Sequence, residues 1–208
     1  MKYIFVAGAP GSKWSSVVKN IYYSPDIDRS DYRDAWTYYH DASGTMDLMH
    51  LGAYFDPGMA SPLPEDLTTL NRSQLEEIFA QPFQSADPEG TRIIKSHVFS
   101  EHIPFLRELF PEVPIVMVHR GDDACLGWWV KCGHFDITYP DYHEYFKNLK
   151  NMAQIIKRQN IGIANAALAY PGQVPYDNLE ICKLLNIQTP PVEYQQVYEL
   201  ADIKVVVI

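Results

Sequence analysis

The N-terminal segment constrains the fold of this chain more than any other part of it. Residues 3–7 form a short apolar run that is typical of a strand buried on both faces of a sheet. Residues 8–12, Gly-Ala-Pro-Gly-Ser, interrupt this run, and a helix is predicted from about 13 to 23, where Ser24-Pro25 ends it. A strand, a glycine loop and a helix in this order open a parallel α/β sheet.

Further apolar patterns predict the remaining strands and helices. Buried strands are predicted at residues 92–97 and 113–118, and the apolar tail 203–208 predicts a last strand. Strands that alternate with helices predict an α/β fold class, a three-layer sandwich around a central, mostly parallel sheet. Ser73, with Glu76 three residues later, is the predicted cap of the first of these helices. The predicted helices are 74–80, 101–110, 122–131, 141–158 and 177–185.

We interpret residues 1–208 as a single domain with an inserted segment at 24–90. Residues 24–72 are rich in Tyr, Asp, Pro, Gly and Met and show weak periodicity, and a further loop is predicted at 81–90. This composition is typical of a partly irregular lid or acceptor-side insertion. A loop-rich surface layer, in which the aromatic side chains serve as anchors, explains it equally well.

Composition and cysteine usage exclude several classes of protein. The net charge of −9 argues against an extended nucleic-acid surface, since phosphate binding needs a basic field. Cys125, Cys132 and Cys182 are odd in number and widely spaced, which suits a reducing compartment. Cys132 and His134 have no second pair that would complete a zinc site. Because no signal peptide and no run of about 18 apolar residues is visible, we expect a cytoplasmic protein with no metal and no membrane partner.

The glycine loop is the first of three loops that carry candidate chemistry, since ligands bind beyond the carboxyl ends of parallel strands. Its glycines let backbone N–H groups approach an anion, the following helix N-terminus favours negative charge, and lysine and serine add donors. The loop does not match the Walker pattern. Its glycines and donors predict phosphate-type binding, and a tight strand-to-helix turn is the alternative. The candidate binding residues are Gly8, Ala9, Pro10, Gly11, Ser12, Lys13, Trp14, Ser15 and Ser16.

The second loop follows the strand at 92–97. Residues i and i+2 of a strand share a face, so Lys95 and His97 should point into the same space. A cation and a titratable base in one space suit the transfer of an anionic group to a hydroxyl, because the lysine neutralises the leaving group and the histidine takes the proton. A chance pairing on the surface is the alternative.

The third loop follows the strand at 113–118 and contains Arg120. A guanidinium is planar and always charged, which makes an arginine at the mouth of a buried strand a good phosphate clamp. An ion pair between Arg120 and Asp122, Asp123 or another acid is the alternative.

These motifs resemble the sulfotransferases that use 3′-phosphoadenosine 5′-phosphosulfate (PAPS). Residues 8–16 resemble the Pro-Lys-Ser-Gly-Thr-Thr loop that binds the 5′-phosphosulfate in that family. Residues 95–97, Lys-Ser-His, resemble its Lys-Thr-His strand end, and 113–129 resemble its strand, arginine and helix at the 3′-phosphate. Residues 176–179, Tyr-Asp-Asn-Leu, resemble its later Tyr-Glu-Asp-Leu. The motifs stand in the family's order across residues 3–186.

Some features depart from the family pattern. Gly11 follows Pro10 where the family has its lysine, and the lysine stands at Lys13. Trp128 stands where the family has a serine in the helix after Arg120. The C-terminal Arg-Lys-Gly segment of many members has no counterpart, and the chain is short for the family.

The resemblance implies a P-loop-like α/β fold and a reaction. A sulfuryl group would move from PAPS to a hydroxyl or amine of a small-molecule or glycan acceptor, leaving 3′-phosphoadenosine 5′-phosphate (PAP) without the help of a metal. His97 is implied as the base on the acceptor. Lys95 and Lys13 are implied to stabilise charge on the bridging and equatorial oxygens.

The resemblance also implies which residues contact the nucleotide. Arg120 is implied at the 3′-phosphate, and Tyr176 is a further residue on the nucleotide side. Trp14 is either an adenine-stacking residue or part of the core. No nucleic-acid partner is implied, and no oligomeric state is predicted.

Two other functions are carried as alternatives. A P-loop nucleotide kinase or NTPase would need a true Walker loop and an apolar strand that ends in a magnesium-binding Asp. The strand at 113–118 is followed by His119 and Arg120 instead. A catalytically inactive nucleotide-binding relative would fit the altered loops.

Overall fold

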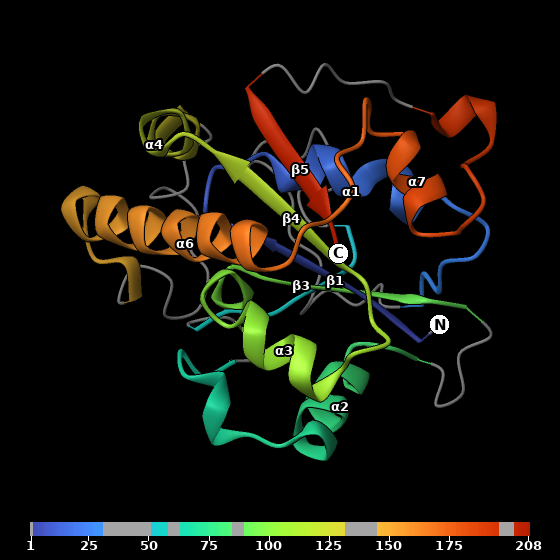
Figure 1. The fold of residues 1–208 in the computed structure, drawn as a ribbon, viewed down its shortest axis with the longest axis horizontal. Helices are drawn as coiled ribbons and strands as arrows, with labels where there is room; N and C mark the ends of the chain where they lie inside the picture. Colours follow the sequence, from blue (N-terminus) through green and yellow to red (C-terminus); the bar gives the residue numbers. More distant parts are fainter. Residues whose placement is uncertain (1, 31–50, 58–62, 85–89, 132–144, 196–201) are drawn as a thin grey trace.

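The computed structural model describes residues 2–30, 51–57, 63–84, 90–131, 145–195 and 202–208. Over these residues the chain forms a five-stranded sheet with the order β2-β3-β1-β4-β5 (Figure 1). Pairing is parallel from β2 to β4, and β5 joins β4 antiparallel. The α/β class with a mostly parallel central sheet is therefore confirmed. The strands are β1 (Tyr3–Gly8), β2 (Ala53–Tyr54), β3 (Arg92–Ser96), β4 (Ile115–Arg120) and β5 (Ile203–Val207).

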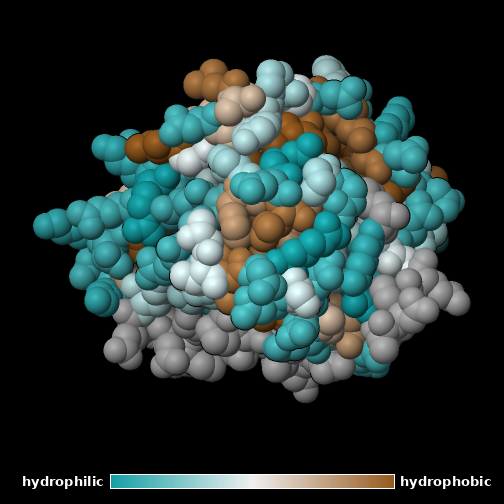
Figure 2. All heavy atoms as spheres, turned by 60° about the horizontal axis from the view of Figure 1, so that its bottom comes forward, coloured by the Kyte–Doolittle hydropathy of each residue, from teal (hydrophilic) through white to brown (hydrophobic). Residues whose placement is uncertain are grey.

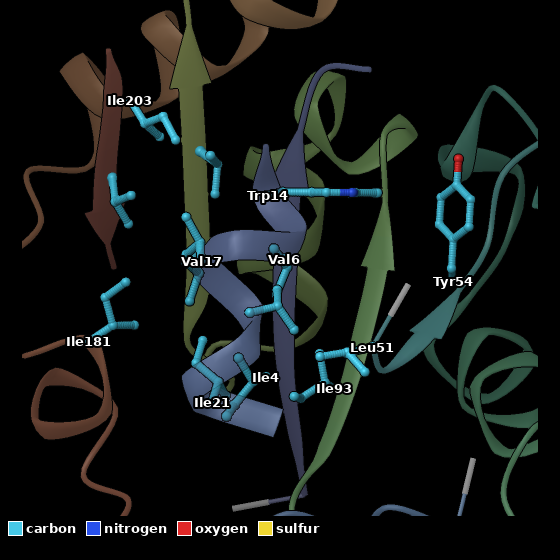
Figure 3. Close-up of a cluster of buried hydrophobic side chains, with 14 of the residues drawn as sticks. Ile4, Val6, Trp14, Val17, Ile21, Leu51, Tyr54, Ile93, Ile181 and Ile203 are labelled. Carbon is cyan, nitrogen blue, oxygen red and sulfur yellow. The ribbon is translucent and has the colours of Figure 1, made fainter. Parts of the chain in front are cut away.

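Helices flank the sheet on both sides, because β1 is apolar on both faces. Ile4 and Val6 pack in one core cluster with Val17 and Ile21 of α1 (Figure 3), whereas Phe5 lies in a second cluster with side chains of α2 and α3. The helices are α1 (Trp14–Tyr22), α2 (Arg72–Ala80), α3 (Ile103–Leu109), α4 (Asp122–Lys131), α6 (Leu149–Ala169) and α7 (Glu180–Leu184). Short 3₁₀ turns occupy η1 (Leu67–Thr69), η2 (Val98–Glu101) and η3 (Val192–Tyr194).

Part of the predicted insertion at 24–90 belongs to the core. β2 pairs in parallel with β3, and Phe79 of α2 packs edge-on against Phe5 with the ring centroids 5.6 Å apart. The weak periodicity of residues 24–72 did not predict β2, because a two-residue strand is too short to show an alternating pattern. The aromatic side chains predicted for a lid at residues 31–50 lie outside the described residues.

The long amphipathic helix overlaps the predicted range 141–158 and extends beyond its predicted end. α6 begins at Leu149, because the Asn148 side chain accepts the backbone N–H of Asn151 at 3.0 Å and caps the helix. The helix then continues to Ala169, well past the predicted end. The predicted start at 141–144 lies outside the described residues.

The cap of α2 also differs from the prediction. Asn71, and not Ser73, is the N-cap, and its side chain accepts the backbone N–H of Gln74 at 3.1 Å. The Gln74 side chain accepts the N–H of Asn71 in return, which completes a capping box that was wrongly expected to involve Glu76.

β4 extends two residues beyond the apolar run that predicted it. The antiparallel strand β5 supplies backbone partners for the polar end, since His119 pairs with Lys204 and Arg120 with Ile203. Arg120 therefore belongs to the strand, and only 8% of it is exposed. This placement decides which groups the guanidinium meets.

The face in Figure 2 is mostly hydrophilic, with hydrophobic side chains gathered in smaller areas. Among the helices of the described residues, none combines the length and the apolar character needed to cross a bilayer.

Candidate active site

The strand order brings the three predicted loops to one edge of the sheet. β1 lies between β3 and β4, and the three strands are parallel, so the residues after their carboxyl ends are neighbours. A ring nitrogen of His97 contacts the Gly8 carbonyl, and the Arg120 guanidinium donates to the Gly11 carbonyl at 3.1 Å. The glycine loop thus contacts both the loop after β3 and the end of β4.

The glycine loop is a tight turn held against α4. Gly11 has a φ of +78°, and a Cβ built there would lie 2.0 Å from the backbone carbonyl oxygen of Cys125. The N–H of Ser12 donates to the carbonyl of Ala9 at 3.0 Å, and Lys13, with a φ of 62°, precedes α1 without a side-chain cap. Glycine is required here both for its backbone conformation and for the close approach of the helix.

Replacing Gly11 with alanine is expected to lower the free energy of unfolding by about 3 kcal/mol or more, since positive-φ strain alone costs about 1–3 kcal/mol. The added methyl group would also push the loop away from α4. Gly127 in α4 is the matched control, because a Cβ there meets nothing within 4 Å. Gly127→Ala should stabilise the protein by up to about 1 kcal/mol. Urea unfolding followed by circular dichroism measures both changes, and equal stability of the two variants would contradict the prediction.

Lys95 and His97 both lie against the indole of Trp14. The His97 ring stacks on Trp14 with centroids 4.0 Å apart and an interplanar angle of 13°, and the Lys95 ammonium nitrogen lies 5.3 Å from the centroid. Lys95 is fully buried and Trp14 is 4% exposed. Lys95 and His97 are therefore packed groups and not a chance pairing on the surface.

His97 is held as a neutral ring with a defined proton position. Its Nδ1 faces the Gly8 carbonyl, which can only accept, so Nδ1 carries the hydrogen and Nε2 keeps the lone pair. Burial lowers the pKa of His97 to about 3. The hydrogen bond to the Gly8 carbonyl raises this pKa, and the positive charge of Lys95 lowers it. The tautomer is the one that a general base acting through Nε2 requires.

Asp56 is a buried carboxylate beside His97 that sequence reasoning missed. It accepts hydrogen bonds from the Tyr54 hydroxyl at 2.6 Å, from the Ser96 hydroxyl at 2.9 Å and from the backbone N–H of His97 at 2.9 Å. Burial outweighs these bonds and raises the pKa of Asp56 to about 7. The one signal in the sequence was an acid directly after the apolar residues 53–55, which is where a parallel strand delivers a functional side chain.

The donors of Arg120 are engaged within the protein. Its Nε and Nη2 donate to Asp202 at 2.8 and 2.6 Å, and its Nη1 donates to the carbonyls of Gly11 and Ala124 at 3.1 and 3.0 Å. This is the ion pair that the sequence left open as the alternative to a phosphate clamp. Its partner is Asp202, which directly precedes β5 and not α4.

Lys13 shares the same carboxylate. Its ammonium nitrogen lies 3.6 Å from Oδ2 of Asp202 and 4.8 Å from the centroid of Trp128. The Arg120 guanidinium lies 5.8 Å from that ring. Hydrogen bonding from Arg120 is the main cause that lowers the pKa of Asp202, and the charge of Lys13 adds to it. The Asp202 carboxylate thus lies between Arg120 and Lys13, the two cations that the sequence predicted to bind the nucleotide.

The remaining candidates occupy different environments. Ser12 is buried, and Ser15 and Ser16 are half-buried in the first turn of α1. Trp14 lies in the core cluster with Tyr54 (Figure 3), with an edge-on contact at 5.4 Å between centroids. Tyr176 is 91% exposed, its backbone N–H donates to Glu180, and none of the contacts described for residues 8–16 includes it.

The comparisons with known proteins assign no family to this site. No family model, no curated protein and no solved structure matches the chain. Within the described ranges, no three or more His, Cys, Asp and Glu side chains group in a way that could hold a metal ion.

Proposed function

We propose that the protein is a sulfotransferase that moves a sulfuryl group from PAPS to a hydroxyl or amine of a small-molecule or glycan acceptor. The observation that carries the proposal is the state of His97. The ring is anchored through Nδ1 to Gly8 of the glycine loop, packed beside Lys95, and keeps Nε2 as its proton-accepting nitrogen. A base, a cation and a glycine loop in contact at the carboxyl edge of parallel strands suit transfer of an anionic group.

The reaction follows from the charges. The acceptor oxygen would form a bond to sulfur as its O–H bond breaks and the proton passes to Nε2 of His97. The bond between sulfur and the bridging oxygen would break, and PAP would leave with the electron pair. Lys95 would offset the charge that develops on the bridging oxygen, so positioning and electrostatics would supply most of the rate.

The donor side of the site has to compete with Asp202. A 3′- or 5′-phosphate that uses Arg120 or Lys13 must replace the carboxylate that now accepts from both. A phosphate brings more charge and more acceptor oxygens than a carboxylate, which favours the exchange. Asp202 is half-exposed, so its displacement into water leaves no buried charge behind.

Asp202→Asn is expected to tighten PAP binding by about 3- to 10-fold, since removing a competing charge is worth on the order of 1 kcal/mol. The amide keeps the shape of the carboxylate but withdraws its charge from Arg120 and Lys13. Asp66→Asn, at an exposed cap of η1, makes the same change in net charge elsewhere and should leave PAP affinity unchanged. Isothermal titration calorimetry decides the point, and weaker PAP binding in Asp202→Asn would place the phosphates away from these cations.

Calorimetry with PAP also tests the proposed function, because it needs no knowledge of the acceptor. We expect PAP to bind in the micromolar range and ATP and ADP to bind much more weakly in the absence of magnesium. PAP binding would justify a screen of acceptors with PAPS. No PAP binding, or a preference for ATP that appears only with magnesium, would refute the proposal that the protein is a sulfotransferase.

A catalytically inactive nucleotide-binding relative is the second candidate. The observation that favours it is the engagement of all the Arg120 donor groups by Asp202, Gly11 and Ala124. PAP binding without any turnover of PAPS would support this candidate.

A further inference from the structure

A carboxylate oxygen of Asp56 and the proton-accepting ring nitrogen of His97 face each other. Oδ2 of Asp56 lies 3.8 Å from Nε2 of His97, and their side chains are 2% and 8% exposed. The opposite edge of the ring is fixed by Gly8, and the carboxylate is fixed by Tyr54 and Ser96. The separation is therefore set by several contacts on different strands and not by the flexibility of either side chain.

His97 alone is poorly suited to hold a proton. An imidazolium here would be buried and close to the charge of Lys95, and both effects favour the neutral ring. An ionised carboxylate at 3.8 Å works against this preference, because it attracts the positive charge of an imidazolium where water is excluded. Burial also raises the pKa of Asp56 to about 7, so Asp56 changes charge near neutral pH.

The titratable and charged groups that bear on the pair come from several elements. Tyr54 on β2 donates to Asp56, and Lys95 on β3 repels a proton from His97. Burial raises the pKa of Tyr145, which precedes α6, and the negative charge of Asp56 raises it further. Lys95, Tyr54 and Tyr145 therefore bear on the pair, and Oδ2 of Asp56 lies 3.8 Å from Nε2 of His97.

We propose that Asp56 and His97 act as one proton-accepting pair, in which His97 takes the proton of the acceptor only while Asp56 is ionised. The proposal rests on the proposed function, and it adds a positioning residue that neither the motifs nor the resemblance contained. Asp56 holds the backbone of His97 through its N–H and stabilises the imidazolium. It does not itself contact the acceptor.

The step balances in protons and electrons. The O–H or N–H bond of the acceptor breaks, its electron pair forms the bond to the sulfur of PAPS, and PAP leaves with the pair of the bridging bond. The proton moves to Nε2 of His97, and Asp56 remains a carboxylate beside the imidazolium. Release of the proton to water after the product leaves restores the neutral ring.

The first test reads the pair without any turnover. Ring ¹⁵N shifts of His97, assigned by comparison with His97→Asn, should show the Nδ1-protonated neutral tautomer across about pH 5–8. A small inflection near pH 7, from ionisation of Asp56, should be present in the wild type. It should be absent in Asp56→Asn and unchanged in the matched surface variant Asp66→Asn. An inflection that persists in Asp56→Asn overturns the proposal.

A second variant keeps the test decisive if Asp56→Asn fails to fold. Tyr54→Phe retains the carboxylate but removes the hydroxyl that donates to it at 2.6 Å, a bond that lowers the pKa of Asp56. The inflection at His97 should then move to higher pH. An unmoved inflection shows that another group titrates, and the proposal fails.

The kinetic test separates this proposal from the proposed function. With PAPS and an acceptor found by screening, kcat of the wild type should rise with pH through an ionisation near 7. In Asp56→Asn this rise of kcat with pH should be absent. Its kcat should fall by about tenfold or more with the PAP affinity unchanged. If kcat of Asp56→Asn still rises with pH near 7, the proposed Asp56–His97 pair is overturned and the proposed sulfotransferase function is not. Absence of PAP binding by the wild type overturns the sulfotransferase, whichever way the ¹⁵N shifts behave.

Discussion

His97→Asn is expected to lower the turnover of sulfuryl transfer by about 10²–10⁴-fold, the usual contribution of a general base. Asparagine carries an amide nitrogen near the position of Nδ1, so it can still donate to the Gly8 carbonyl and hold the glycine loop. It offers no basic nitrogen in place of Nε2. PAP binding should stay within a few-fold of the wild type, because the proposed mechanism puts His97 at the acceptor and not at the phosphates. His97→Ala should lose activity by a similar factor.

The control for this variant is His102→Asn. The His102 ring contacts the Glu65 carbonyl at 2.7 Å on the surface, so the same substitution there should leave turnover unchanged. Initial rates of PAP release from PAPS, with calorimetric PAP binding alongside, measure the two effects separately. Turnover of His97→Asn equal to that of the wild type would remove His97 from the mechanism.

Replacing either member of the buried pair should reveal opposite pH dependences of stability. Burial lowers the pKa of His97 from 6.5 to about 3. Between these two pH values the unfolded chain binds more protons at this residue than the folded chain does, so its contribution to the free energy of unfolding increases as the pH rises. Burial raises the pKa of Asp56 from 3.8 to about 7, so the folded chain binds more protons and this residue removes stability as pH rises. The two contributions oppose each other between about pH 4 and 6.5 in the wild type.

Each variant should expose the contribution that remains. As the pH rises from about 4.5 to 6.5, the free energy of unfolding of Asp56→Asn should increase by about 2–3 kcal/mol relative to that of the wild type. One pKa unit corresponds to about 1.4 kcal/mol. His97→Asn should lose a similar amount, because only Asp56 then titrates. Urea unfolding at several pH values gives these free energies, and the shared surface groups cancel between the variants. Parallel profiles for the two variants would show that the residues do not titrate as the burial implies.

The glycine loop shows what the local sequence can predict and what it cannot. Residues 8–12 were predicted as a strand-to-helix loop from their composition alone, and the structure has this loop at 9–13, one residue later, because Gly8 still pairs as the last residue of β1. The requirement for Gly11 comes from α4, whose Cys125 carbonyl lies against it. A contact between residues so distant along the chain leaves no mark in the local pattern.

Arg120 illustrates the same limit at the candidate site. The end of an apolar strand identified it as a functional candidate, and an ion pair with an acid was carried as the alternative. The acid is Asp202, which β5 brings alongside β4 from the far end of the chain. Asp56 was missed for a related reason, since β2 is too short for its apolar pattern to be distinguished from a loop.

The sequence by itself determined the α/β class, most of the strands and helices, and the glycine loop and Lys-Ser-His end as places of interest, because alternation, apolar runs and turn residues act over a few neighbours. Only the tertiary structure decided the protonation and pairing of these groups. It buried His97 on Trp14 and beside Asp56, and it set Asp202 between Lys13 and Arg120. Charge and pKa depend on burial and on neighbours in space, and the packing of strands distant in sequence sets both.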